Sequence, residues 1–392
     1  MTYRLLWFAL AFVAGLIARA ALAADTYNID VIDPLSGGGA FLGKSQEVSL
    51  AATEKVINAE GGFRGKRVHF VIHDDQTSPQ VAVQLLNDVA AAKPPFVLGS
   101  TISGICNAMA PLVKQGPVMW CFSPSIRPEP GGYEFTSQVA SRDQQRALMT
   151  YFQAKGWKSI ALITTTDASG QDAEKAIIDL LKEPEFADMK LVTNQHFNPS
   201  DVSVSAQIEN MRAANPQVIV SWATAAAGGT VFRALVQAGI SLPTAASGSN
   251  MTVGQMLQYA AFLPKEIMFG VSEWAAHGDK RIGMPDAVIA EQNKFFAAAK
   301  EAGYEPDAGS DVGWDIPRLI LAAMRQLPEN ATAEQLHDFL IKWKGHTGID
   351  GVYDFVKTPQ RGLDVTNAVV VNWDATTKSW HLLSKTGGKP IE

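Results

Sequence analysis

The sequence predicts an α/β fold made of two parallel-sheet lobes, and three observations lead to this prediction. Without residues 1–24, about 368 residues remain, which is too long for one ordinary core and favours two domains. Short apolar runs alternate with amphipathic stretches, as in parallel strands covered by helices. The alternation starts again after Ser141, so each half of the chain is expected to build one lobe.

The first half supplies strands and helices in turn. Val68, Phe70 and Ile72 recur at every second position, which is typical of a strand. Apolar residues at helical spacing, such as Val48, Ala52 and Val56, instead predict a helix. The expected strands are 27–33, 67–73, 96–99 and 118–122, the expected helices are 44–59 and 79–91, and a Gly-rich loop is expected at 34–43.

The second half repeats this alternation. The expected strands are 159–164, 189–193 and 217–222, and the expected helices are 142–155, 171–182, 203–214 and 229–238. Ligands of such sheets bind beyond the carboxyl ends of the strands. The loops at these ends are rich in Gly, Ser and Thr, so we expect a polar cleft where the two lobes face each other.

The first 24 residues predict export through a cleaved signal peptide. Arg4 precedes an apolar run at 5–17, and Ala21-Leu22-Ala23 matches the small-x-small pattern of a signal-peptidase site. The run is too short for a membrane span, which needs about 20 apolar residues. We therefore expect a mature protein in the periplasm.

Charge and motifs argue against two classes of function. The formal net charge is −6, and no cluster of Lys and Arg indicates a nucleic-acid partner. Nucleotide-binding Gly motifs and a nucleophile elbow are absent from the sequence. His69 and His73 would lie about 13 Å apart on a strand, too far to share a metal. We expect neither an enzyme nor a bound cofactor or metal.

The chain contains two cysteines, Cys106 and Cys121. Cys106 falls early in the helix expected after strand 96–99, and Cys121 falls near the end of the next strand. Both positions lie at the same edge of the sheet, and an oxidising compartment permits a disulfide. The alternative is two buried free thiols.

Several stretches together resemble one known family. The stretches are Pro34-Leu35-Ser36-Gly37, Ile57-Asn58-Ala59-Glu60-Gly61-Gly62, Asp74-Asp75, Val97-Leu98-Gly99-Ser100, Ser123-Pro124-Ser125, and Phe232-Arg233-Ala234-Leu235-Val236-Gln237-Ala238-Gly239. In order and spacing they are similar to the periplasmic binding proteins of the leucine/isoleucine/valine type, which serve ABC importers. The resemblance covers nearly the whole chain after the signal peptide.

The resemblance implies a type I periplasmic binding protein, whose two parallel-sheet lobes are joined by three crossover strands. Lobe one would be residues 25–140 plus 271–350, lobe two would be 141–270 plus 351–380, and 381–392 would form a C-terminal tail. Such a monomer closes around a small ligand by hinge motion and delivers it to the membrane permease subunits of the importer. The alternatives are a ligand sensor that feeds a receptor and, more remotely, an exported hydrolase.

By the same resemblance, lobe one holds a ligand carboxylate. Ser103 and the loop from Ser123 to Ser125 match the positions that do so in amino-acid-binding relatives. A hydroxyl group suits an anion, although Ser103 could instead cap its helix. Arg127 lies nearby and is expected either to bind the carboxylate or to form a surface salt bridge.

Lobe two departs from the family pattern. Relatives that bind amino acids carry an acid in the loop that here contains Ser249 and Asn250, and this loop has none. Ser169 and Thr224 stand where those relatives have aromatic residues. A buried ammonium without a negative partner is costly. The expected ligand is therefore a small carboxylate: an aromatic or hydrophobic acid that has a bulkier body and no ammonium group, with an amino acid as the alternative.

Three aromatic residues are candidates for an apolar wall beside the ligand: Phe41, Trp274 and Trp314. For each of them, packing in the hydrophobic core is the alternative interpretation.

Overall fold

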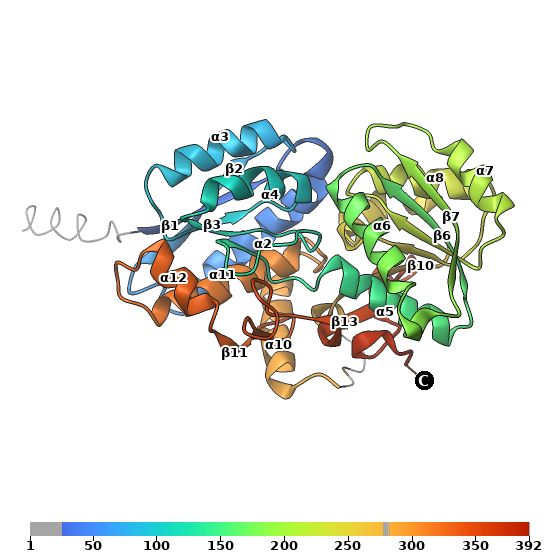
Figure 1. The fold of residues 1–392 in the computed structure, drawn as a ribbon. Helices are drawn as coiled ribbons and strands as arrows, with labels where there is room; N and C mark the ends of the chain where they lie inside the picture. The colour runs from blue at the N-terminus through green and yellow to red at the C-terminus, as the bar shows by residue number, and fades with distance from the viewer. Residues whose placement is uncertain (1–25, 277–280, 282, 392) are drawn as a thin grey trace, which may run out of the picture.

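The computed structural model describes residues 26–276, 281 and 283–391. The predicted signal peptide, residues 1–24, lies outside the described residues. Two large sheets form two lobes that lie side by side, as Figure 1 shows. One lobe carries α3 (Pro79–Ala90) and α4 (Ser103–Met109), and the other carries α6 (Ala168–Leu180), α7 (Ser205–Ala213) and α8 (Ala227–Gln237). Within the described ranges, no helix is long and apolar enough to cross a membrane.

Lobe one is built around a five-stranded parallel sheet. Its strands are β1 (Thr26–Asp33), β2 (Arg67–Asp74), β3 (Phe96–Gly99), β4 (Val118–Trp120) and β5 (Glu134–Phe135), in the order β2-β1-β3-β4-β5. Its helices from this part of the chain are α2 (Ala40–Ala59), α3 (Pro79–Ala90) and α4 (Ser103–Met109). Every strand expected from the sequence in this half is present. The strand β5 was not expected, because two residues carry no readable periodicity.

Lobe two is built around a seven-stranded mixed sheet. Its strands are β6 (Ser159–Thr165), β7 (Lys190–Phe197), β8 (Val218–Trp222), β9 (Thr244–Ala246), β10 (Ile267–Ser272), β13 (Ala368–Asp374) and β14 (Ser379–Leu382), in the order β14-β13-β10-β9-β8-β6-β7. The helices are α5 (Ser141–Ala154), α6 (Ala168–Leu180), α7 (Ser205–Ala213), α8 (Ala227–Gln237) and α9 (Val253–Gln258). The strands β6 to β10 pair in parallel, whereas β13 and β14 are antiparallel to their neighbours.

The chain passes between the lobes three times. After β10 it returns to lobe one with α10 (Asp286–Ala302), α11 (Ser310–Arg325), α12 (Ala333–Leu340) and the hairpin β11 (Lys344–Thr347) and β12 (Val352–Asp354). Helices α10 and α11 pack on α2. The chain then crosses back to end in β13 and β14. The expected α/β class with two lobes and three crossings is confirmed.

Helix α2 begins four residues before the start expected from the sequence. The Gly-rich stretch was expected to remain a loop, but Gly43 lies inside the helix against the carbonyl of Pro34. A Cβ at Gly43 would lie 2.0 Å from that carbonyl oxygen, so this close approach needs glycine. Thr77 Oγ1 accepts a hydrogen bond from the N–H of Gly39, 3.0 Å away, just before the helix.

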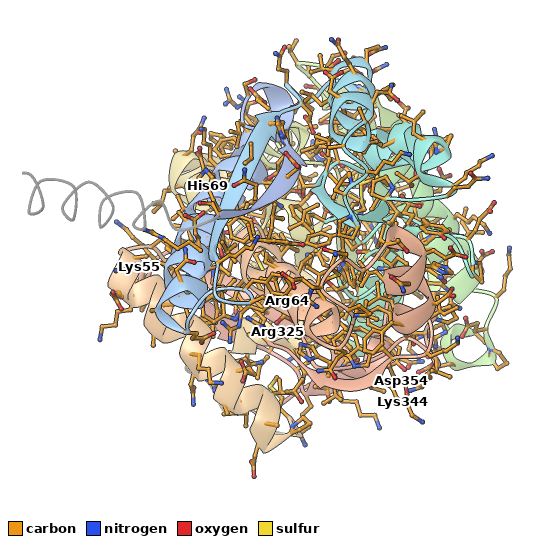
Figure 2. All side chains as sticks on the ribbon, turned by 90° about the vertical axis from the view of Figure 1, so that its left-hand side faces the viewer. Lys55, Arg64, His69, Arg325, Lys344 and Asp354 are labelled. Carbon is orange, nitrogen blue, oxygen red and sulfur yellow. A yellow bond between two sulfur atoms is a disulfide. The ribbon has the colours of Figure 1, made fainter. Side chains whose placement is uncertain are left out.

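Two arginine residues connect the segment after α2 to the end of α11 in lobe one. Arg64 donates hydrogen bonds to the carbonyls of Met324 and Leu327 at the end of α11, both over 2.6 Å. A positive charge is favourable there because the last carbonyls give a helix a negative end. Arg64 and Arg325 lie close together in Figure 2, and both guanidinium groups contact the ring of Phe63.

Candidate ligand-binding cleft

A continuous run of buried polar groups crosses from lobe one to lobe two. Ser103 Oγ and Ser123 Oγ are 2.7 Å apart, and the N–H of Ser125 donates to Ser123 Oγ over 3.3 Å. Ser125 Oγ lies 3.3 Å from Ser169 Oγ of lobe two, which accepts a hydrogen bond from Trp222 Nε1 over 3.3 Å. All five side chains are buried. We call these five residues the interlobe polar cluster.

Strand topology explains why these residues meet. Ser103 opens α4 shortly after β3, and Ser123 and Ser125 follow β4. Ser169 lies in the first turn of α6 after β6, and Trp222 is the last residue of β8. Parallel strands bring their carboxyl ends to one edge of the sheet. Both lobes turn this edge toward the other lobe, so four serines that the sequence singled out become neighbours.

A disulfide supports the lobe-one half of the cluster. Cys106 and Cys121 are bonded, with their Cα atoms 6.1 Å apart. Cys106 lies one turn after Ser103 in α4, and Cys121 lies two residues before Ser123. The bond therefore joins the two segments that carry these serines.

Arg127 forms a salt bridge across the cleft. Its Nε lies 2.5 Å from Asp172 Oδ1 on α6, and Ser141 Oγ also donates to Asp172. About half of the Arg127 side chain is exposed. Of the two roles expected for Arg127, this geometry matches the salt bridge, because the guanidinium already has a carboxylate partner at the rim.

The loop from Ser247 to Asn250, which contains no acidic residue, is held by hydrogen bonds to a neighbouring loop. Ser249 Oγ accepts from the N–H of Ala225 over 3.4 Å, and Asn250 Nδ2 donates to the carbonyl of Ala225 over 2.7 Å. The side chain of Asn250 also packs on Gly228, where a Cβ would lie 2.5 Å from its nitrogen. Thr224 directly precedes Ala225, so three of the four residues predicted in lobe two lie in one connected region, and the fourth, Ser169, lies in the interlobe polar cluster.

The expected aromatic wall is divided between two places. Phe41 lies in a groove of about 600 Å³ between α2 and α9, where its ring meets the ring of Tyr259 at 6.1 Å. Trp274 instead lies in the core, edge-on to Phe295, and Trp314 packs on the same Phe295 ring. Core packing therefore accounts for both tryptophans, whereas Phe41 borders open space between the lobes.

The three crossings between the lobes contact one another beside the cleft. The N–H of Thr136 donates to the carbonyl of Gln360 over 2.9 Å, and Arg361 donates to the carbonyl of Gln138 over 2.7 Å. On the other side, Asn367 Nδ2 donates to Glu273 Oε1 over 3.1 Å. The third crossing is thus bonded to both of the others.

Buried carboxyl groups gather at these crossings. Burial raises the pKa of Glu273 to about 7. The pKa of Asp350 is raised well above its usual range, first by burial and then by the neighbouring Asp311 and Asp315 carboxyls. These groups are held by neutral donors; for example, Tyr353 donates to Asp315 over 2.7 Å. The region of the crossings therefore favours protonated carboxyl groups.

His69 and His73, which we expect not to share a metal ion, each contact a different carboxylate group. His69 lies 3.2 Å from Glu54, and His73 lies 2.8 Å from Asp30. In the part of the chain that the structure describes, no group of three or more His, Cys, Asp or Glu residues could hold a metal ion.

Sequence reasoning missed three residues of the cleft. Trp222 was read only as the end of a strand, and Gln144 and Asp172 only as members of helices. For Gln144 a signal did exist, because it is polar yet lies four residues before Leu148, on the buried face of α5. For Asp172 no signal existed, because its partner Arg127 comes from the other lobe.

A family model described as periplasmic binding protein matches residues 26–378. The chain belongs to the periplasmic binding protein family. The Leu/Ile/Val-binding protein homolog 3 of Brucella melitensis is 27% identical to this periplasmic binding protein over 238 residues. That match covers 58% of this chain and 62% of the relative, so the chain spans about three fifths of the relative's length. The family expected from the sequence is confirmed.

Solved structures share the fold of this periplasmic binding protein at low sequence identity. A branched-chain amino acid transporter substrate-binding protein of Streptococcus pneumoniae, in complex with isoleucine, has a TM-score of 0.77 and 18% identity, and covers 91% of this chain and 99% of its own. A solute-binding protein of an ABC transporter from R. palustris, in complex with benzoate, has a TM-score of 0.76 and 16% identity, with coverage of 93% and 97%. These likenesses confirm the type I fold.

Proposed function

We propose that this protein captures a small carboxylate in the cleft between its lobes and delivers it to the permease subunits of an ABC importer. The observation that carries the proposal is the interlobe polar cluster. Three buried serines of lobe one meet Ser169 and Trp222 of lobe two. A ligand held at this junction contacts both lobes, so its binding favours the closed arrangement.

The polar groups of the cluster are hydroxyls and an indole N–H, which can donate hydrogen bonds to an anion. A carboxylate therefore suits the cluster. The ligand class includes hydrophobic or aromatic acids as well as amino acids. Small side chains at Ser169 and Thr224 leave room for a broad body. Two proteins of the same fold, bound to isoleucine and to benzoate, support this range.

We also propose where the protein acts and in which oligomeric state. The protein is exported by the signal peptide at residues 1–24, acts as a periplasmic monomer and catalyses no reaction. Lobe one comprises residues 25–140 plus a second part that begins near residue 271 and includes the β11–β12 hairpin, and lobe two comprises 141–270 plus the strands β13 and β14. Relatives that are binding proteins support this assignment.

A thermal-shift screen tests the proposal. Benzoate, isoleucine and related acids are compared with their methyl esters, which lack the negative charge. A ligand at one hundred times its Kd stabilises the folded protein by about 2.7 kcal/mol, which is a measurable shift in the unfolding temperature. We expect at least one acid, and none of the esters, to give this shift.

Substitution of Ser103 locates the site. Removing a hydrogen bond to a charged group costs about 1.5–3 kcal/mol, so Ser103→Ala should raise Kd about ten- to a hundredfold. Ser203→Ala is the matched control, because this serine is exposed on lobe two. Stabilisation by the esters as strong as by the acids, or equal binding by both variants, contradicts a carboxylate site at this cluster.

A further inference from the structure

Three buried polar atoms border the same loop of lobe two without a partner. Within residues 26–276, 281 and 283–391, no hydrogen bond reaches Gln144 Oε1, Thr224 Oγ1 or Asn250 Oδ1. Gln144 and Asn250 are almost completely buried, with 3% and 0% of their surface exposed. A buried polar atom that lacks a hydrogen bond costs about 1–3 kcal/mol. Three such atoms beside one loop need an explanation, and a bound ligand group would supply it.

The orientation of both amides is fixed by their nitrogen atoms. Gln144 Nε2 donates to the carbonyl of Val139 over 3.0 Å, and Asn250 Nδ2 donates to the carbonyl of Ala225 over 2.7 Å. Because each nitrogen faces a carbonyl, the free end of each amide is its oxygen. The two oxygens can accept hydrogen bonds but cannot donate them.

The three atoms lie on or beside the loop from Ser247 to Asn250. A Cβ on Gly248 would lie 3.5 Å from Gln144 Oε1, so this oxygen lies beside the loop. Thr224 adjoins Ala225, to which the loop is bonded through Ser249 and Asn250. The loop also borders the carboxyl ends of β8 and β9, at the edge that faces lobe one. The acceptors therefore lie around the carboxyl ends of the lobe-two strands, which face lobe one.

We propose that these acceptors, Gln144 Oε1, Asn250 Oδ1 and Thr224 Oγ1, receive neutral hydrogen-bond donors of the ligand, either hydroxyl or amide N–H groups. This inference rests on the proposed function, because the same ligand places its carboxylate at the interlobe polar cluster. The loop itself has no carboxyl group, and amide oxygens carry no net charge. These amide oxygens can accept a hydrogen bond from a neutral donor, whereas a buried ammonium group requires a negatively charged partner.

This arrangement selects among acids of similar shape. A site built to accept a ligand hydroxyl discriminates against the analogue without it, because that analogue leaves the buried acceptors unpaired. It also discriminates against the matching ammonium, which is desolvated without a counter-charge. The preferred ligands are thus small acids that carry a hydroxyl or a carboxamide.

Calorimetry with matched ligands tests this inference. One series is 4-methylpentanoate, 2-hydroxy-4-methylpentanoate and leucine, which present hydrogen, hydroxyl and ammonium on one skeleton. The other is benzoate, its three hydroxy isomers and 4-carbamoylbenzoate. In at least one series we expect the hydroxyl or amide ligand to bind the native protein about tenfold or more tightly than the unsubstituted acid. Leucine should bind more weakly than its hydroxy analogue.

Variants connect the preference to the named atoms. Gln144→Met keeps the length of the side chain and removes its acceptor, so the preference should fall at least fivefold. Thr224→Val is a second, smaller change that should also reduce the preference. Gln153→Met is the matched control, because Gln153 lies on the same helix α5 but bonds to Glu185 and Asp188 instead of the loop, and the preference should be unchanged. Unfolding temperatures of all three variants verify folding.

The outcomes separate this inference from the function on which it rests. If acids bind but show no preference for a donor, or if both variants keep the native preference, the inference is wrong and the proposed function stands. Tighter binding of leucine than of its hydroxy analogue likewise overturns the inference alone. If no acid in either series binds, the proposed carboxylate function fails, and this inference fails with it.

Discussion

At the scale of single residues, the carboxyl group of Glu273 makes the stability of the folded protein depend on pH. It is 2% exposed, and its Oε1 accepts a hydrogen bond from Asn367 of the third crossing. Burial raises its pKa from 4.5 to about 7. Between these two values the folded protein retains a proton that the unfolded chain has released, so stability falls as pH rises through this window.

Replacing Glu273 by Gln should remove this contribution. Glutamine keeps a carbonyl oxygen for Asn367 and carries no charge at any pH. At about 1.4 kcal/mol per pKa unit, the variant should gain up to about 3 kcal/mol over the native protein at pH 8, and nothing near pH 4.5. Urea unfolding at a series of pH values measures both curves.

Two features of this experiment make it decisive. The pKa of Glu134 is also raised to about 7, chiefly by burial, but Glu134 is present in both proteins and cancels in the difference. Glu329→Gln provides the control, because Glu329 is exposed. A difference between the Glu273 variant and the native protein that stays constant from pH 4.5 to pH 8 would show that the carboxyl group does not titrate in this way.

At the scale of elements, the disulfide joins helix α4 to the segment after strand β4. Cys106 and Cys121 are 15 residues apart, and closing a loop of this length stabilises a protein by about 3 kcal/mol in the chain-entropy account. The double variant Cys106→Ala with Cys121→Ala should lose about this much free energy of unfolding in urea. A thiol reductant should destabilise the native protein and leave the variant unchanged; an equal effect on both contradicts a role for the bond.

The sequence predicts elements well where a local pattern exists. Strands β1, β3 and β6 coincide with their predicted ranges to within one residue, because β3 and β6 carry continuous apolar runs and β1 alternates polar with apolar residues at its start. The strand β5 and the early start of α2 escaped prediction for opposite reasons. β5 is too short to show a pattern, and α2 contains a glycine that is required by contact with Pro34 rather than by the helix itself.

Residues of the candidate site could likewise be predicted only where a local sequence pattern marks them. Ser103, Ser123 and Ser125 could be singled out because loops at the ends of strands are visible in the sequence. Gln144 offered only the signal of a polar residue on a buried helix face. Trp222 offered none, because a residue within a strand reaches the cleft only through the packing of the two sheets. The Arg127–Asp172 pair needs both lobes in contact, and no local pattern encodes that contact.

At the scale of the whole molecule, contacts of two kinds hold the lobes in their present arrangement. The crossings are covalent and persist in any arrangement of the lobes. The contacts at the cleft, such as Ser125 with Ser169 and Arg127 with Asp172, exist only while the lobes touch. Contacts of the second kind stabilise the closed form relative to an open one, and therefore influence how long a ligand stays bound.

The Arg127–Asp172 salt bridge permits a test of this idea. Half-exposed ion pairs contribute about 0.2–1 kcal/mol, so Arg127→Leu should raise the ligand dissociation rate between about 1.4-fold and fivefold. The effect should shrink as salt is added, since salt screens exposed charges. Stopped-flow measurement with any acid that binds gives the rate. Arg212→Leu is the control, because Arg212 pairs with Glu209 within α7 and spans no interface. Equal rates for the Arg127 variant and the native protein at low salt would mean that the salt bridge does not hold the lobes closed.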